Sequence, residues 1–116
     1  MDPRVAHAID RIEEQLHLPI RVAELAADAG LSVSQLTRLF RAATGQTPGA
    51  FLHARRMMRA RVLVECTSLS IVEVMTRVGA SDPSHFARDF RRTHGLSPRA
   101  LRVQLRLATR RRAVVV

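Results

Sequence analysis

Apolar positions along the chain recur every three to four residues, which is the spacing of one face of an α-helix. Within residues 4–16 the apolar positions that share a face are Val5, Ile9, Ile12 and Leu16. Within residues 33–44 the positions expected to face inward are Leu36, Leu39, Phe40 and Ala43. No stretch alternates apolar and polar residues for long enough to predict a strand. The pattern therefore predicts an all-α chain.

Glycines and capping residues divide this pattern into seven predicted helices. Apolar stretches end at Gly30, Gly45, Gly79 and Gly95, where a helix C-terminal cap takes the left-handed conformation. Helix starts are marked by Ser32 with Gln35, Thr47 with Pro48, Ser70 with Glu73, Asp82 with Pro83, and Ser97 with Pro98. The long helix that begins at Pro48 would span about 27 to 30 Å at ~1.5 Å per residue.

Two stretches of the chain are nearly the same. Residues 36–51 read LTRLFRAATGQTPGAF, and residues 86–101 read FARDFRRTHGLSPRAL. The spacing between equivalent turn glycines is 49 residues from Gly30 to Gly79 but 50 from Gly45 to Gly95. The second turn should therefore carry one extra residue, and the repeat indicates a structural task that is performed twice.

Each repeat combines a short helix, a tight turn and an amphipathic helix with a polar outer face, which is the helix-turn-helix pattern. The predicted segments are a first subdomain (1–46, recognition helix about 33–44), a linker helix (47–66), a second subdomain (67–108, recognition helix about 83–94) and a basic, disordered tail (109–116). Because the linker helix is comparable in length with the ~34 Å turn of B-DNA, it could hold both recognition helices in successive major-groove segments.

The charge balance favours a polyanionic partner. The chain has nineteen arginines, no lysine and ten acidic residues, with a net charge of +9 and a pI near 11.8. Such a surface attracts nucleic acid, although ribosomal and membrane-surface proteins are also basic. The lone Cys66, expected as a buried thiol, excludes an internal disulfide and favours a reducing cytoplasm. No run approaches the length of a membrane span, and no signal segment opens the sequence.

Polar residues on the two predicted recognition helices are the candidate DNA contacts. The base-reading candidates are Ser34, Thr37, Arg38, Ser84, His85 and Arg88. The phosphate-contact candidates are Arg41, Arg91, Arg92, Thr47 and Ser97. Arginine can bind guanine or a phosphate through two parallel hydrogen bonds. The alternatives are a solvated arginine paired with a helix neighbour and, for the shorter side chains, exposed residues without a function.

The linker helix carries a further group of basic residues that cannot all face the same way, namely Arg55, Arg56, Arg59 and Arg61. Some should touch the DNA backbone, and the others should pair with Glu65, Glu73 or Asp89. The four phenylalanines occupy apolar-face positions and are expected in the core. We expect no enzyme, metal site or cofactor, because the histidines are scattered and no phosphate loop or nucleophile motif is present.

Residues 5–105 resemble the DNA-binding domain of the AraC/XylS family of bacterial transcription regulators. The resemblance rests on LAADAGLSVSQLTRLFRAATGQTP, RRMMRARVLV and VGASDPSHFARDFRRTHGLSPRALR. It implies seven helices in two helix-turn-helix subdomains, a monomeric domain on one asymmetric site, and base-reading roles at the six positions given above. The departures are Ala80 where the family commonly has Phe, Met75 where it has a small residue, and Arg21 where it has Ser or Thr.

The sequence thus predicts a DNA-binding, sequence-specific transcription regulator, with activation through RNA polymerase implied by the resemblance. The alternative is a protein-interaction module that contacts RNA polymerase or a sister domain and binds DNA weakly, and an architectural nucleic-acid-binding protein ranks third. The sequence does not identify the target DNA site, the effector, or whether the protein activates or represses transcription. We expect an excised C-terminal domain in preference to a stand-alone regulator, since the sequence starts directly at the first predicted helix.

Overall fold

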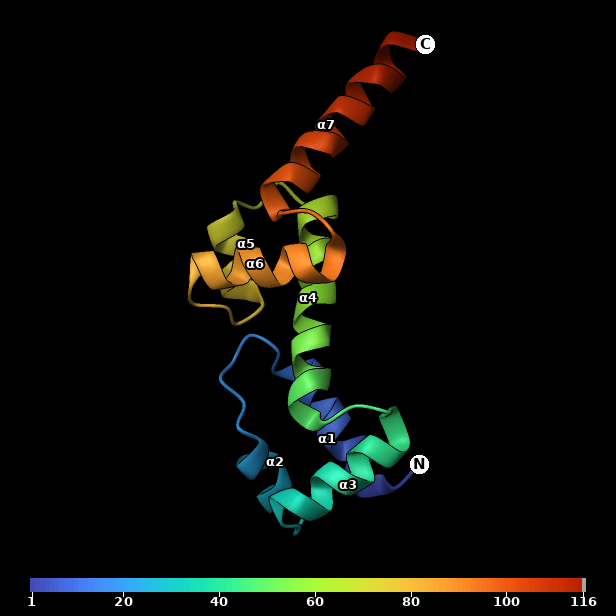
Figure 1. The fold of residues 1–116 in the computed structure, drawn as a ribbon, viewed down its shortest axis with the longest axis vertical. Helices are drawn as coiled ribbons and strands as arrows, with labels where there is room; N and C mark the ends of the chain where they lie inside the picture. The colour runs from blue at the N-terminus through green and yellow to red at the C-terminus, as the bar shows by residue number, and fades with distance from the viewer. Residues whose placement is uncertain (116) are drawn as a thin grey trace. The chain divides into compact units, whose positions relative to one another are not determined.

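In this computed structural model the backbone is described for residues 1–115 and the side chains for residues 1–112. The described chain contains seven helices and no strand (Figure 1). The helices are α1 (Pro3–Glu14), α2 (Val22–Asp28), α3 (Val33–Thr44), α4 (Pro48–Cys66), α5 (Ile71–Arg77), α6 (Pro83–His94) and α7 (Pro98–Val115). The all-α prediction is confirmed. No described helix is both long enough and apolar enough to cross a membrane.

The chain forms two compact units, and the boundary between them falls inside α4, between Arg56 and Met57. Each half of α4 contributes to a different core: Phe51 and Leu52 belong to the first, and Met57 to the second. The sequence treats residues 47–66 as a separate linker, whereas the structure divides this helix between the units. The reason is that the apolar residues of the two halves lie on different faces of the helix. Each half therefore packs into the core of its own unit.

The core of the first unit is built from the apolar faces of four helical segments. Its buried residues are Val5, Ala8, Ile12, Leu16, Leu25, Ala26, Leu36, Phe40, Phe51 and Leu52. The rings of Phe40 and Phe51 meet edge to face with 5.2 Å between their centroids, which is a favoured aromatic geometry. Ala43, expected to face inward, is exposed in the last turn of α3, beyond the buried Leu36 and Phe40.

The second unit repeats this design, with the C-terminal half of α4 in the place of α1. Its buried residues are Met57, Ala60, Val64, Val74, Met75, Val78, Phe86, Phe90 and Leu101. The imidazole of His94 packs on the ring of Phe90 at 4.5 Å, and its Nε2 lies 3.0 Å from the carbonyl oxygen of Met57. All four phenylalanines of the chain are core residues, as predicted.

The expectation of a buried cysteine is wrong. Cys66 is exposed at the last residue of α4, on the same side of the helix as the exposed Met58 and Val62. The buried stripe of this half-helix runs instead through Met57, Ala60 and Val64. Both stripes are apolar at helical spacing, and only the packing partners in the second unit decide which one is covered.

Helix α7 continues to Val115, although the sequence predicts a disordered tail over residues 109–116. Residue 116 lies outside the described residues. The physical reason for the longer helix is composition: no glycine or proline follows Pro98, and the segment is rich in arginine, leucine and alanine, which favour helix.

Candidate nucleic-acid interface

The turn between α2 and α3 is fixed by backbone hydrogen bonds around one left-handed glycine. The N–H of Leu31 donates to the carbonyl oxygen of Ala26 at 2.9 Å, and that of Gly30 donates to Ala27 at 3.0 Å. This is the Schellman pattern, which needs a positive φ at Gly30, here 70°. Ser32 then caps α3 at once, and Gln35 completes the capping box. The turn thus redirects the chain within four residues, as a helix-turn-helix requires.

The turn between α5 and α6 uses the same bonds. The N–H of Ala80 donates to the carbonyl oxygen of Met75 at 2.9 Å, and Gly79 has a φ of 74°. Five residues separate these helices, against four in the first unit, so the structure has the extra residue that the sequence predicts. The side chain of Asp82 caps α6 by accepting from the N–H of His85 at 3.1 Å. This hydrogen bond lowers the pKa of the Asp82 carboxyl.

At each turn one large and one small apolar side chain pack together, and their order along the sequence is reversed between the two units. In the first unit the small Ala26 is buried and the larger Leu31 packs against the core. In the second unit the large Met75 is buried, with 5% of its surface exposed, and the small Ala80 packs against the core. A Schellman turn brings these two positions into contact. The two departures from the family pattern therefore complement each other in volume.

The outer face of α3 brings the predicted residues of the first unit together. Ser34, Arg38 and Arg41 are exposed, and Thr37 is half-buried, while Leu36 and Phe40 face the core. These four polar residues, with Val33 and Ala42, line one shallow open hollow. No salt bridge in the described part of the chain involves Arg38, so the alternative of a paired arginine has no support there.

The outer face of α6 is the equivalent surface of the second unit. Ser84, His85, Arg88, Arg91 and Arg92 are all exposed, and Phe86 and Phe90 are buried beneath them. Asp89 is a nearly buried carboxylate on this helix, with only 8% of its surface exposed. It lies 3.2 Å from Nε2 of His85 and 3.9 Å from Nη1 of Arg92. Arg88, like Arg38, has no salt bridge among the described residues.

Thr47 and Ser97 occupy the N-caps of α4 and α7. Their hydroxyl oxygens accept hydrogen bonds from the N–H groups of Ala50 and Ala100, at 3.2 and 3.1 Å. Both residues are half-buried. A phosphate at these positions would therefore be met by the remaining unpaired N–H groups of the helix N-terminus as well as by the hydroxyl.

The arginines of α4 have mostly structural partners. The expected pairing with Glu65 is present, since Arg61 lies 2.6 Å from that carboxylate. Arg55 pairs instead with Glu13 at 2.9 Å, and Arg56 donates to the carbonyl oxygens of Leu16 and Leu18. Burial lowers the pKa of the Arg56 guanidinium. Arg59 is exposed.

Glu73 and Asp89 have partners outside α4 in the described residues. Glu73 completes the capping box of α5 by accepting from the N–H of Ser70, and this hydrogen bond lowers the pKa of its carboxyl. Asp89 lies beside His85 and Arg92 of its own helix. The sequence alone did not show that Glu73 and Asp89 would bind these other groups in place of the α4 arginines.

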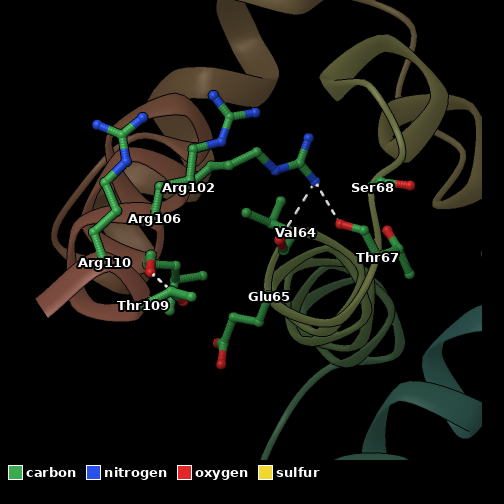
Figure 2. Close-up of a pocket in the computed structure, with 9 residues that line it drawn as sticks. Val64, Glu65, Thr67, Ser68, Arg102, Arg106, Thr109 and Arg110 are labelled. Carbon is green, nitrogen blue, oxygen red and sulfur yellow. Dashed lines mark hydrogen bonds between the residues drawn. The ribbon is translucent and has the colours of Figure 1, made fainter. Parts of the chain in front are cut away.

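Helix α7 contributes a basic groove that the sequence analysis missed. The groove is lined by Val64, Glu65, Thr67, Ser68, Arg102, Leu105, Arg106, Thr109 and Arg110 (Figure 2). Its arginines recur four residues apart on α7, and this spacing was the signal available in the sequence. No group of three or more His, Cys, Asp and Glu side chains suited to a metal ion is found in the described residues.

Comparison with protein families identifies the architecture. Residues 25–104 match the model of a family described as a helix-turn-helix domain. The transcriptional activator NphR of Rhodococcus sp. is 41% identical over 88 residues, which are 75% of this chain and 26% of that protein. The transcriptional activator RhaS of Klebsiella pneumoniae is 34% identical over 101 residues, covering 87% of this chain and 36% of that protein. The chain thus spans about a third of the length of these curated relatives.

Solved structures agree over nearly the whole chain. The DNA-binding domain of the global transcriptional factor AdpA, crystallised with a target DNA, superposes with a TM-score of 0.85 and 34% identity, covering 90% of this chain and 95% of that one. An AraC-type regulator from Chromobacterium violaceum superposes with a TM-score of 0.80 and 32% identity, covering 89% and 92%. The fold with two helix-turn-helix units is therefore shared with DNA-binding domains of transcriptional regulators.

Proposed function

The chain belongs to the AraC-type family of transcriptional regulators, whose DNA-binding domain it carries, and from this premise we propose that it reads one specific double-stranded sequence. The observation that carries the proposal is the equivalence of two exposed faces. Arg38 on α3 and Arg88 on α6 occupy the same position in the two repeats, both exposed and both without a salt bridge among the described residues.

The base-reading roles follow from the position of each residue on its helix. Residues near the N-terminus of a recognition helix approach base edges, and Ser34 and Ser84 lie in the first turns of α3 and α6. Thr37, Arg38, His85 and Arg88 complete the two faces. The arginines would donate two parallel hydrogen bonds to guanine, and the hydroxyls would make short contacts that tolerate several bases.

Affinity would come mainly from contacts to the sugar-phosphate backbone. Arg41, Arg91 and Arg92 lie toward the C-terminal ends of α3 and α6, where the exposed guanidinium groups suit phosphate better than base edges. Thr47 and Ser97 would add contacts at the N-termini of α4 and α7. This part of the binding is independent of sequence and weakens as salt rises.

A single copy of the domain would insert α3 and α6 into successive segments of the major groove. The 19-residue α4 is about 28 Å long at ~1.5 Å per residue, comparable with the ~34 Å turn of B-DNA. The site would be asymmetric, because the two faces carry different residues. We further propose activation of transcription through contact with RNA polymerase, in line with the activator names of two relatives.

The test is selection of binding sites from a random duplex pool at near-physiological salt, followed by affinity titrations of the selected duplex across salt concentrations. We expect an asymmetric site with two sequence blocks about one helical turn apart. Recovery of a single block would restrict base reading to one unit. Absence of enrichment would overturn the proposal and leave the domain as a protein-interaction module with weak, sequence-independent DNA binding.

A further inference from the structure

The first part of α7 is fastened to the end of α4 by one arginine. Arg102 donates hydrogen bonds to the carbonyl oxygens of Leu69, Val64 and Thr67, the last two at 3.3 Å. The final carbonyls of a helix carry partial negative charge and lack partners within the helix. Arg102 therefore has a structural task within the second unit, because it ties the first part of α7 to the end of α4.

The next two arginines on the same side of α7 have no such task. Arg106 and Arg110 follow Arg102 at intervals of four residues and line the same groove, and both are exposed. In the view of Figure 2 both side chains extend toward the same side of α7, and the carboxylate of Glu65 points in the opposite direction. Glu65 is engaged by Arg61 at 2.6 Å. No described residue forms a salt bridge with Arg106 or Arg110.

The other polar groups of the groove leave these arginines as its main donors. The hydroxyl of Thr109 donates to the carbonyl oxygen of Leu105 at 3.0 Å, and that of Thr67 donates to Leu63. The chain contains no acidic residue after Asp89. Glu65 is the carboxylate that lines the groove, and it is already paired with Arg61. An anion entering the groove would thus meet two arginines that form no salt bridge with a described residue.

The repeat provides an internal comparison. The positions equivalent to Arg106 and Arg110, fifty residues earlier on α4, are Arg56 at the end of the first unit and Ala60 in the core of the second. Arg56 donates hydrogen bonds to the carbonyl oxygens of Leu16 and Leu18, and Ala60 is fully buried. Neither equivalent position on α4 therefore holds an arginine without a structural partner. The pair on α7 is additional to what the fold needs.

We propose that Arg106 and Arg110 bind the phosphate backbone of DNA beyond the segment contacted by α6, so that α7 forms a third contact region next to the two helix-turn-helix units. The inference rests on the proposed function, because it takes DNA as the polyanion. Two cations on adjacent turns rise about 6 Å along the helix and can face consecutive phosphates of one strand. The contact would add affinity and length to the site without reading bases.

The experiment compares the wild-type domain with R106Q/R110Q and with R111Q/R112Q. The second variant removes the same charge from α7 but on its other sides, and glutamine preserves helix propensity in both. Each protein is titrated against two duplexes of identical core sequence. One ends at the edge of the segment contacted by α6, and the other continues for about one helical turn.

We expect the longer duplex to bind the wild type and R111Q/R112Q more tightly than the shorter one, and R106Q/R110Q to lose that difference. Loss of two phosphate contacts should lower the salt slope by about 1.8, so that the affinity change between 50 and 200 mM salt shrinks by roughly tenfold. Equal slopes for all three proteins, or the same loss in both variants, would overturn the assignment to the groove side of α7.

A failure of the proposed function would look different. If no preferred sequence exists, the salt slopes of the three proteins can still be compared on a duplex of arbitrary sequence, and this comparison tests the α7 contact by itself. If a preferred site exists but its affinity is independent of duplex length and of the R106Q/R110Q change, the regulator reading stands and the α7 contact is rejected. Thermal unfolding of each variant verifies that the fold is retained.

Discussion

Nε2 of His85 lies 3.2 Å from Oδ2 of Asp89, one turn further along α6. One partner is exposed and the other nearly buried, so the carboxylate holds an imidazole that faces solvent. Because Nε2 is engaged with the carboxylate, Nδ1 is the ring nitrogen left for a base edge. In the neutral ring Nδ1 then accepts a hydrogen bond, and in the charged ring it donates one. Asp89 is thus a candidate for positioning His85 without touching DNA.

Asp89→Asn should weaken discrimination at the base pair met by His85 by about 1 kcal/mol, because the amide no longer favours one ring orientation. The measurement is site selection repeated with the variant. Arg92→Gln is the control, since it removes a second charged neighbour of Asp89 and leaves the pair with His85 intact. A lower melting temperature with an unchanged base preference would make Asp89 purely structural.

Arg38→Ala and Arg88→Ala should each weaken the preferred site by about 1 to 3 kcal/mol and leave nonspecific binding little changed, as expected for base contacts. Arg41→Ala should instead weaken all sequences alike and reduce the salt slope by about 1. Affinity titrations on specific and random duplexes separate the two classes. Uniform weakening by the Arg38 and Arg88 variants would assign both to phosphate.

The packing of the large Met75 against the small Ala80 predicts that substitutions at these two positions have nonadditive effects on stability. Ala80→Phe alone should destabilise the second unit by about 1 to 3 kcal/mol through overpacking. Met75→Ala alone should cost about 2 to 5 kcal/mol through a cavity. The double variant should recover part of this loss, with a coupling of about 0.5 to 3 kcal/mol in denaturant unfolding. If the stability losses of the two single variants simply add in the double variant, the two side chains do not pack against each other.

Acid should destabilise the fold through its helix caps. The pKa values of Glu73 and Asp82 are lowered below their ordinary 4.5 and 3.8, mainly by hydrogen bonds from Ser70 and His85 backbone N–H groups. Carboxyls with lowered pKa contribute stability above the ordinary pKa and lose it as pH falls through the folded value. The melting temperature should therefore decline as pH drops below about 4.5.

Glu73→Gln offers a matched test, because Gln35 fills the same capping-box position in α3 and keeps its hydrogen bond to the N–H of Ser32. The variant should show a shallower decline of melting temperature in acid than the wild type. The same decline in both proteins would place the acid sensitivity elsewhere in the chain.

Arg21→Ser should stabilise the first unit. Arg21 occupies the N-cap of α2 in an extended conformation and makes no side-chain cap hydrogen bond. A serine there can accept from a free N–H of the first turn and should add about 0.5 to 1 kcal/mol. Ser32→Ala, which removes an existing cap from α3, should cost about 1 kcal/mol. Denaturant unfolding of both variants measures the difference.

Local features of the chain were predictable because their causes are local. The capping boxes at Ser32 and Ser70 and the glycine turns at Gly30 and Gly79 depend on residues within one or two helical turns. The exposed polar faces of α3 and α6 follow from helical periodicity. The roles of their residues on DNA remain predictions, since periodicity identifies an outer face but not what binds there.

Features that depend on packing were not predictable in the same way. Helix α4 has apolar residues on several sides, so the sequence alone did not show that Cys66 is exposed and Val64 buried. The partner of Arg56 is a pair of backbone carbonyls near residue 17, forty positions away, and backbone acceptors leave no mark in a sequence pattern. The groove of α7 likewise arises only when the end of α4 is placed beside it.

The exposed faces of α3, α6 and α7 carry guanidinium groups and no ammonium groups. A guanidinium keeps its proton throughout the pH range in which proteins fold, and acetyl transfer to lysine has no substrate on these helices. Histone-like neutralisation by acetylation is therefore closed to this surface. The arginine charges of this surface therefore stay unchanged by lysine acetylation, and amine-reactive reagents would find no lysine side chain on the three faces.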